Sequence, residues 1–226
     1  MSQIRPSSNS RPANISPVAP LYAITDSKLM PGIQLLEKVE QALTAGVHWV
    51  QYRDKSKDKR KRLAEASALM TLCSDHRALL FINDDLELAK AIDAPGLHLG
   101  QSDTPVAVAR ERLGDKIIIG ATCHASLDLA QQAYNAGASY LAFGRLFSSH
   151  TKPNAENAPL SILAEAKLRF QLPIVAIGGI NANNAAEVYA AGADSLALCH
   201  HLFSGDDVQS RVQTLRSLFP VQPCEY

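Results

Sequence analysis

Carboxylates and cations recur in the first half of the sequence, each time just after a short apolar run. Arg53 and Lys55 follow one run, Asp84 follows the next, and Asp103 follows a third. Two carboxylates suit a hard divalent cation, because Mg²⁺ commonly binds one or two of them together with phosphate oxygens. Nearby cations would neutralise a highly charged anion. These residue types predict a site for a magnesium-bound anion such as a diphosphate.

The second half of the sequence carries groups suited to a simpler phosphate. Gly178 and Gly179 follow one apolar run directly, and a further turn follows the run at 195–199. Backbone N–H groups exposed at such turns bind phosphate without any special side chain. Lys152 adds a cation to the same half. Together the two halves predict a pocket for two phosphorylated small molecules.

Several of these residues also have structural interpretations. The cations could form ion pairs with neighbouring carboxylates in a network that only stabilises the fold. His124 is compatible with a site role and with a hydrogen-bonded core position, whereas His98 lies inside an apolar run and is interpreted as structural. If His200 and His201 end a strand, they point to opposite faces and cannot bind one metal together.

The elements that must position these residues form a repeating pattern. Short, β-branched apolar runs alternate with Ala- and Leu-rich stretches of helical period, which predicts a parallel sheet covered by helices. Eight units leave no room for a second domain, so the pattern favours a (β/α)8 TIM barrel over an open doubly wound sheet. In such barrels the polar residues that follow the strands converge on one face. The expected strands are 21–24, 48–51, 78–82, 96–99, 117–120, 140–143, 174–177 and 195–199. The expected helices are 32–45, 57–74, 86–91, 105–113, 127–136, 160–170, 185–191 and 208–219.

Length and composition set the domain organisation and exclude several classes of protein. We expect a single barrel domain at 21–220, a flexible Pro- and Ser-rich tail at 1–20, and a short tail at 221–226. An organelle-targeting peptide is the alternative for the first segment. The 226 residues carry 22 basic and 22 acidic side chains, which gives no bulk attraction to nucleic acid or to a membrane surface. No apolar run is as long as a membrane-spanning helix, which needs about 18 residues. The four cysteines form no C-x-x-C pair, so buried free thiols and a cytoplasmic location are expected.

Six segments in order resemble the thiamine-phosphate synthase family, and each lies at an expected strand end. They are LYAITD (21–26), QYRDK (51–55), IND (82–84), LHLGQSD (97–103), the stretch 144–152 and AIGGI (176–180). The resemblance runs from about 21 to 203 and implies the TIM barrel. It also implies a transferase of thiamine biosynthesis that joins 4-amino-2-methyl-5-(diphosphooxymethyl)pyrimidine to thiazole phosphate and releases diphosphate.

The resemblance also implies a role for each residue that matches its motifs. Arg53, Lys55 and Lys152 would clamp the departing diphosphate, and Asp84 and Asp103 would hold Mg²⁺. Thr122 and Ser149 replace a Ser and a Thr that are frequent in the family, which keeps both hydroxyl groups. The pyrimidine diphosphate would contact Gln51, Arg53, Lys55, Asn83, Thr122 and Lys152, and the thiazole phosphate would contact Ser149, Thr151, Gly179, Cys199 and His200.

Two other functions stay open at this point. A thiazole tautomerase shares the barrel and the thiazole phosphate site, and it would use His124 as its acid and base. A tautomerase would have no use for two metal-binding carboxylates. The other alternative is a non-catalytic sensor of phosphorylated ligands, which predicts that the polar strand ends are eroded. Both a monomer and a homo-oligomer are compatible with the sequence.

Overall fold

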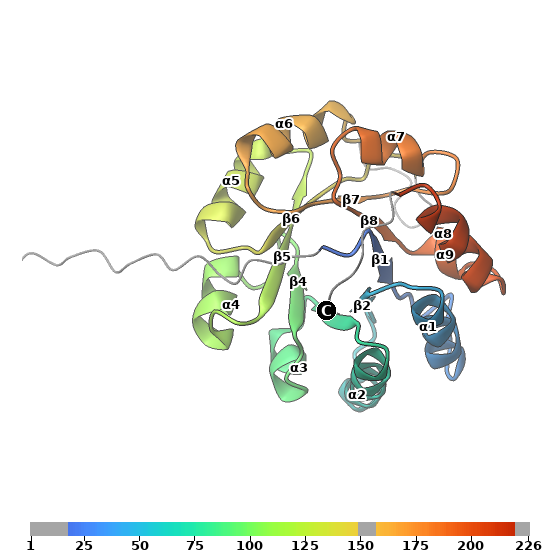
Figure 1. Ribbon diagram of the computed structural model, residues 1–226. Helices are drawn as coiled ribbons and strands as arrows, with labels where there is room; N and C mark the ends of the chain where they lie inside the picture. The colour runs from blue at the N-terminus through green and yellow to red at the C-terminus, as the bar shows by residue number, and fades with distance from the viewer. Residues whose placement is uncertain (1–17, 149–156, 220–226) are drawn as a thin grey trace, which may run out of the picture.

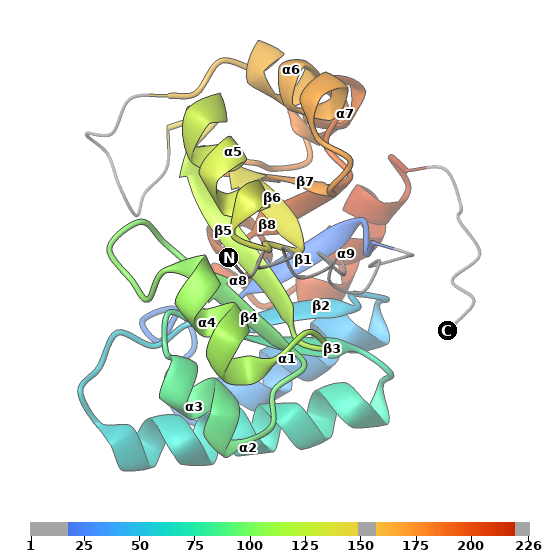
Figure 2. The same ribbon diagram turned by 90° about the vertical axis from the view of Figure 1, so that its left-hand side faces the viewer.

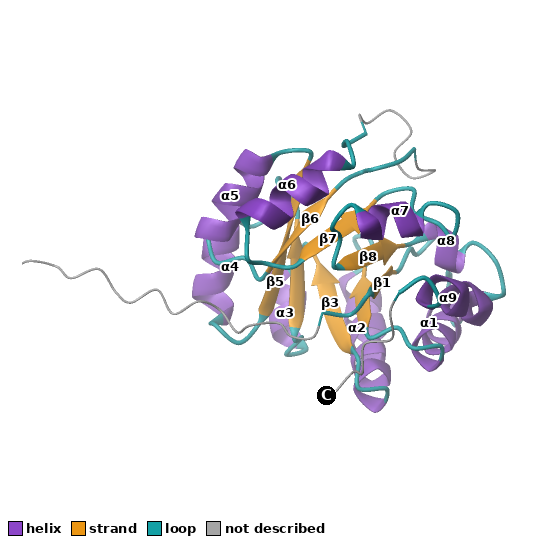
Figure 3. Ribbon diagram, turned by 45° about the horizontal axis from the view of Figure 1, so that its top comes forward, coloured by secondary structure: helices purple, strands orange, loops and turns teal. Residues whose placement is uncertain are grey.

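The computed structural model describes residues 18–148 and 157–219, and within them eight parallel strands close into a barrel. Each strand pairs with its neighbour in chain order, and β8 returns to pair with β1. Figure 1 shows the strands at the centre of the molecule, and Figure 3 shows them enclosed by the helices. The strands are β1 (Leu21–Ile24), β2 (Trp49–Tyr52), β3 (Leu79–Asn83), β4 (Gly96–Leu99), β5 (Ile118–His124), β6 (Tyr140–Phe143), β7 (Ile174–Ile177) and β8 (Ser195–Leu198).

A helix follows every strand and packs against the outside of the barrel, so the predicted (β/α)8 TIM barrel is confirmed. Figure 2 shows the long helix α2 lying across the base of the view, beside α1 and α3. The helices are α1 (Gln34–Thr44), α2 (Lys59–Asp75), α3 (Leu86–Ala91), α4 (Val106–Leu113), α5 (Leu127–Asn135), α6 (Ser161–Arg169), α7 (Ala185–Ala190), α8 (His200–Phe203) and α9 (Val208–Arg216).

Two elements differ from the sequence prediction in ways that affect the site. Strand β5 continues to His124 instead of ending at Gly120, so Thr122 lies on the strand and not in the loop after it. A register shift between Thr122 and His124 marks the end of its pairing with β6. His200 and His201 do not end a strand but begin helix α8, so the argument that they point to opposite faces of a sheet is wrong.

The barrel has two apolar cores because successive side chains on a strand point to opposite faces. One face packs against the helices, and the other fills the barrel with large rings, chiefly Tyr22, Trp49, Phe81 and Tyr140. The centroids of these four rings lie 4.9–6.1 Å apart where pairs contact each other. The barrel is therefore a packed core, and a ligand can enter only at its ends.

The chain is already packed against the barrel before β1 begins. Ala19 is buried against the inner rings, and the carbonyl oxygen of Pro20 accepts a hydrogen bond from the backbone N–H of Leu196 on β8. Residues 1–17 and 220–226, which hold most of the two expected tails, lie outside the described residues. In the part of the chain that the structure describes, no helix is both long and apolar enough to cross a membrane. Cys73 and Cys123 are buried free thiols, as expected.

Candidate active site

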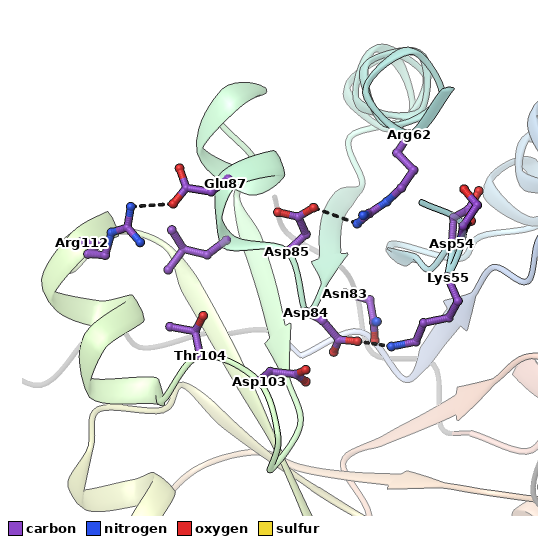
Figure 4. A pocket seen from close by; sticks show the side chains of 12 residues that line it. Asp54, Lys55, Arg62, Asn83, Asp84, Asp85, Glu87, Asp103, Thr104 and Arg112 are labelled. Carbon is purple, nitrogen blue, oxygen red and sulfur yellow. Dashed lines mark hydrogen bonds and ion pairs between the residues drawn. The ribbon is translucent and has the colours of Figure 1, made fainter. Parts of the chain in front are cut away.

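The carboxyl ends of β2, β3 and β4 form one pocket of about 450 Å³. Lys55 comes from the loop after β2, Asn83 and Asp84 from the end of β3, and Asp103 from the loop after β4. Figure 4 shows Asp84 and Asp103 side by side in this pocket, with the ammonium group of Lys55 reaching Asp84. The predicted convergence of these residues is therefore observed.

The two carboxylates form a coupled pair. Burial opposes ionisation of Asp84, but the hydrogen bonds from Asp103 and Lys55 outweigh it, and the pKa of Asp84 lies below the usual range. Burial raises the pKa of Asp103, and its hydrogen bond with Asp84 raises it further. The Asp103 carboxylate also accepts a hydrogen bond of 2.7 Å from the backbone N–H of Gly100. Ionisation is therefore easier at Asp84 than at Asp103, and a cation bound to both carboxylates would favour the ionised form of each.

Asp84 takes a left-handed backbone conformation, with φ of 63°. Its N–H donates to the carbonyl oxygen of His98 on β4, which ties the end of β3 to the neighbouring strand. Directly after it, Asp85 caps helix α3 by accepting a hydrogen bond from the N–H of Leu88, as its position in the sequence indicates. The carboxylate of Asp84 is thus positioned by backbone contacts on both sides.

Contacts of Arg53 and of the next residue, Asp54, hold the loop after β2 in place. The backbone N–H of Arg53 donates to the hydroxyl of buried Thr25 at 2.9 Å, and its guanidinium lies 3.7 Å from Asp26. The next residue, Asp54, is buried and accepts hydrogen bonds from the Lys61 side chain and from a backbone N–H in its own loop. These contacts from β1 and α2 place Arg53 and Lys55 on the rim of the barrel.

Gln51 and Thr122 point into the barrel from β2 and β5 and are joined by buried polar groups. The Gln51 amide donates to the Tyr22 hydroxyl at 2.8 Å, and the Thr122 hydroxyl lies 2.9 Å from Nε2 of His98. The Tyr140 hydroxyl connects the two halves, at 3.1 Å from Tyr22 and 2.9 Å from Nδ1 of His98. Burial lowers the pKa of His98 to about 4, so its ring is neutral at physiological pH.

Sequence reasoning assigned His98 a structural role and did not consider the two tyrosines. A signal was present, because Gln51 and His98 each occupy an inward-facing position near the carboxyl end of a strand. Polar side chains at such positions need partners inside the barrel. Which partners they find depends on the closure of the sheet, and the sequence does not show that.

A second pocket lies at the carboxyl ends of β7 and β8. Gly179, Cys199 and His200 line it, so three residues predicted for the thiazole phosphate are brought together. Gly179 has φ of 68°, and a side chain there would meet the carbonyl oxygen of Ser148 at 2.6 Å. The amide of Asn184 donates to the Gly179 carbonyl oxygen at 3.1 Å and holds this turn in place.

The charges of Asp26 and Arg53, which follow β1 and β2, influence Cys199 in the second pocket. Burial raises the pKa of the Cys199 thiol to about 12, Asp26 raises it further, and Arg53 opposes this effect. Arg53 and Asp26 therefore act on the end of β8, which is closed against β1 in the barrel. The remaining predicted residues, Ser149, Thr151 and Lys152, lie outside the described residues.

Residues 21–202 match a family model described as thiamine monophosphate synthase. The chain belongs to this family. A curated thiamine-phosphate synthase from Saccharophagus degradans is 54% identical over 201 residues, which cover 88% of this chain and 93% of the relative. The resemblance indicated by the six sequence segments is therefore confirmed.

One solved structure agrees with this family membership, and a more distant one shares the fold. A thiamine phosphate pyrophosphorylase from Pyrococcus furiosus superposes with a TM-score of 0.80 at 35% identity, covering 88% of this chain and 94% of that one. A (S)-3-O-geranylgeranylglyceryl phosphate synthase from Thermoplasma acidophilum superposes with a TM-score of 0.68 at 13% identity, covering 88% of this chain and 92% of that one. The second likeness shows the fold alone.

The donors available for a metal in this family member are two carboxylates. Across residues 18–148 and 157–219, no three His, Cys, Asp or Glu side chains gather into a group that could hold a metal ion by themselves. Asp84 and Asp103 supply hard oxygen donors of the kind that Mg²⁺ prefers. The pair fits such a cation when phosphate oxygens or water complete the coordination shell. His124, the residue that a tautomerase would use, is exposed at the end of β5 with φ of 50°.

Proposed function

We propose that this chain is a thiamine-phosphate synthase that joins 4-amino-2-methyl-5-(diphosphooxymethyl)pyrimidine to thiazole phosphate and releases diphosphate. The observation that carries the proposal is the cluster of Lys55, Asp84 and Asp103 in one pocket at the barrel mouth, in a chain that belongs to the thiamine monophosphate synthase family. The 54% identical curated relative bears the same activity in its name. The chain is accordingly a transferase of thiamine biosynthesis.

The first pocket would take the pyrimidine diphosphate. Lys55 lines this pocket and Arg53 lies in the same loop beside Asp26. Both would neutralise the phosphates, and Lys152 would add a third charge from the loop after β6. Asn83 lines the pocket beside Asp84, so its amide can hydrogen-bond a phosphate oxygen. Gln51 and Thr122 lie deeper, on the inner face of the barrel, where they would contact the pyrimidine ring.

Magnesium is the cofactor that this arrangement would require. Asp84 and Asp103 would hold it, and the diphosphate would supply further oxygen ligands. When bound, Mg²⁺ would neutralise the charge that develops on the departing diphosphate. A bound cation would favour the ionised form of Asp103, whose pKa is raised by burial and by Asp84.

The second pocket would take the thiazole phosphate. Gly179 and the start of α8 at His200 would offer backbone N–H groups, and Cys199 would contribute through its backbone as well. Ser149 and Thr151 would complete this site with their hydroxyl groups. Arg53 is in the loop that supplies Lys55 to the first pocket, and its charge acts on Cys199 in the second pocket, so the bond between the two substrates would form near Arg53.

The reaction needs little covalent chemistry from the protein. Diphosphate is a good leaving group once its charge is neutralised, and an aminopyrimidine can stabilise the cation that remains on its methylene carbon. The C–O bond breaks first and its electron pair leaves with the diphosphate, and the thiazole nitrogen then bonds to the methylene carbon. Positioning and charge neutralisation by Arg53, Lys55 and Lys152 are therefore the main contributions to catalysis, and no nucleophile–base pair is required.

The test mixes the purified protein with both substrates and Mg²⁺ and quantifies thiamine phosphate and diphosphate. We expect equal amounts of the two products, and neither product when thiazole phosphate is omitted. The variant Lys55→Met should lose most of the rate, whereas Lys57→Met, an exposed lysine in the same loop, is the matched control. Thiazole isomerisation without diphosphate release would favour the tautomerase, and binding of both compounds without turnover would favour the sensor.

We further propose that the protein acts in the cytoplasm on these small-molecule substrates alone, without a nucleic-acid or membrane partner. The domain boundaries that we propose are those expected from the sequence, with the catalytic barrel at 21–220. Size-exclusion chromatography with light scattering would show whether the barrel forms a homo-oligomer.

A further inference from the structure

A continuous chain of hydrogen bonds crosses the inside of the barrel from Gln51 to Thr122. It passes through the hydroxyls of Tyr22 and Tyr140 and both ring nitrogens of His98. The chain joins side chains from β1, β2, β4, β5 and β6. Its two ends are the residues that we place against the pyrimidine ring.

The chain has a direction because each hydroxyl carries a single hydrogen. The Gln51 amide donates to the Tyr22 oxygen, which fixes one end, whereas the other three contacts are compatible with a donor on either side. From that end, every hydroxyl hydrogen has an acceptor within the chain only if Tyr22 donates to Tyr140 and Tyr140 donates to Nδ1 of His98. A neutral imidazole that accepts at Nδ1 carries its hydrogen at Nε2, from which it would donate to the Thr122 hydroxyl oxygen.

This direction gives the two ends complementary roles. With its NH₂ group directed to Tyr22, Gln51 can present its carbonyl oxygen to a ligand as an acceptor. Thr122, whose oxygen accepts from His98, can donate its own hydrogen to a ligand. An exocyclic amino group next to a ring nitrogen offers the matching pattern, a donor beside an acceptor. An oxo group next to a ring N–H offers the opposite pattern.

We propose that His98 is a positioning residue whose tautomer sets the direction of this chain, so that the site accepts an aminopyrimidine and rejects the corresponding oxopyrimidine. The inference deepens the proposed function and rests on it for the identity of the ligand. If every hydrogen bond in the chain ran in the opposite direction, the Gln51 amide would be flipped and His98 would carry its hydrogen on Nδ1. The tautomer of His98 therefore determines which form of the pyrimidine the two ends can bind.

The surroundings leave this chain little freedom to rearrange. Tyr22 and Tyr140 are 1% and 0% exposed, and their rings pack edge to face against each other. The His98 ring is stacked on Tyr140, with centroids 5.7 Å apart. A buried hydroxyl hydrogen without an acceptor is unfavourable, so one misdirected hydrogen disfavours the whole chain of hydrogen bonds.

The tautomer of His98 can be measured without any ligand. Long-range ¹H–¹⁵N spectra of the histidine-labelled protein distinguish a hydrogen on Nδ1 from one on Nε2, and the variant His98→Gln assigns the signals. We expect the hydrogen on Nε2, with Nδ1 showing the shift of an acceptor in a hydrogen bond. In Tyr140→Phe the Nδ1 shift should change, because its donor is removed. A hydrogen on Nδ1 in the wild-type protein would overturn the proposal.

The specificity is tested by calorimetry with the 4-amino and 4-oxo forms of the pyrimidine diphosphate, with Mg²⁺ and without thiazole phosphate. We expect the ratio of the two affinities to fall at least tenfold in Tyr140→Phe, since Tyr22 and Gln51 can then reverse. The matched control is Tyr52→Phe. Tyr52 lies on the outer face of β2, and the variant removes its 2.7 Å hydrogen bond to Glu65 on α2. Its ratio should stay at the wild-type value.

An unchanged ratio in Tyr140→Phe, or an equal fall in Tyr52→Phe, would overturn the inference because it would indicate a structural role alone. The failure of the proposed function has a different signature. A wild-type protein that prefers the aminopyrimidine but forms no thiamine phosphate would contradict the proposed reaction and support the specificity mechanism. A wild-type protein that forms thiamine phosphate without preferring the amino form would contradict the specificity mechanism alone.

Discussion

The ring of Tyr140 on β6 occupies the space that a side chain at Gly120 on β5 would need. A Cβ at Gly120 would lie 1.9 Å from Cζ of Tyr140 and 2.3 Å from its hydroxyl oxygen. The two residues are paired in the register of the neighbouring strands. Glycine at this position is therefore required for the tyrosine to lie across the barrel and reach His98.

We expect Gly120→Ala to displace Tyr140 and to lower the free energy of unfolding by about 1–3 kcal/mol, the range found for overpacked cores. Urea unfolding followed by circular dichroism measures this loss. In the double variant Gly120→Ala with Tyr140→Leu, the smaller side chain makes room for the methyl group. The double variant should lose less than the sum of the single losses. Additive losses would contradict the steric explanation.

Removal of the Asp103 carboxylate should abolish most Mg²⁺-dependent turnover. Asp103 is paired with Asp84 in the pocket, so the variant Asp103→Ala leaves a cation with one carboxylate in place of two. A loss of about 10²-fold in kcat/KM is expected for such an electrostatic group. The exposed Glu111→Ala on α4 is the control and should keep the wild-type rate. Near-normal turnover of Asp103→Ala at saturating Mg²⁺ would contradict the metal assignment.

The buried Asp54 should make the stability of the barrel depend on pH. Burial opposes its ionisation, but hydrogen bonds from Lys61 and Ser56 outweigh it, and the pKa of Asp54 lies below the usual range. A folded-state pKa below the unfolded value of about 3.9 contributes stability above that pH, and this stability is lost as the pH falls through the folded-state pKa.

We therefore expect Asp54→Asn to lower the free energy of unfolding by about 1–2 kcal/mol at pH 7, in line with a lost charged hydrogen bond. The difference from the wild-type protein should shrink below about pH 4, where the unfolded chain takes up the proton, and should vanish once the pH falls below the folded-state pKa. Urea unfolding at a series of pH values measures it. The exposed Asp58→Asn variant is the control, because asparagine keeps the helix cap at α2 and only an exposed charge is lost. A pH-independent difference at Asp54 would show that charge is not the cause.

The turn after β7 depends on Asn184, so Asn184→Ala should weaken the second pocket selectively. Its amide holds the carbonyl oxygen of Gly179, and its Oδ1 accepts from the backbone N–H of Asn181 at 2.8 Å. We expect the KM for thiazole phosphate to rise about tenfold, while the KM for the pyrimidine diphosphate stays unchanged. Steady-state kinetics with each substrate varied in turn provides the values. The control is Asn135→Ala, an exposed asparagine at the end of α5. An equal rise in both KM values would indicate a general loss of structure.

The order of strands and helices could be predicted from the sequence because it depends on local patterns. Apolar runs such as 140–143 and 174–177 have the same bounds in the structure as in the prediction. Eight predicted strands implied closure into a barrel, and closure implied that the residues that follow the strands share one face of the barrel. The pairing of Lys55 with Asp84 and the placement of Gly179 beside Cys199 follow from that face. The element ends at His124 and His200 were less predictable, since the last hydrogen bonds of a strand depend on its neighbour.

The sequence by itself determined the alternating elements, the family and the set of charged groups at the barrel mouth, because all of these depend on residues that are close together in the sequence. Only the tertiary structure decided that Gln51, Tyr22, Tyr140, His98 and Thr122 form one chain of hydrogen bonds. These residues come from five strands, and their contacts exist only when the sheet closes and Gly120 leaves room for a ring. A contact of this kind depends on the twist and register of the whole barrel, which no local pattern encodes.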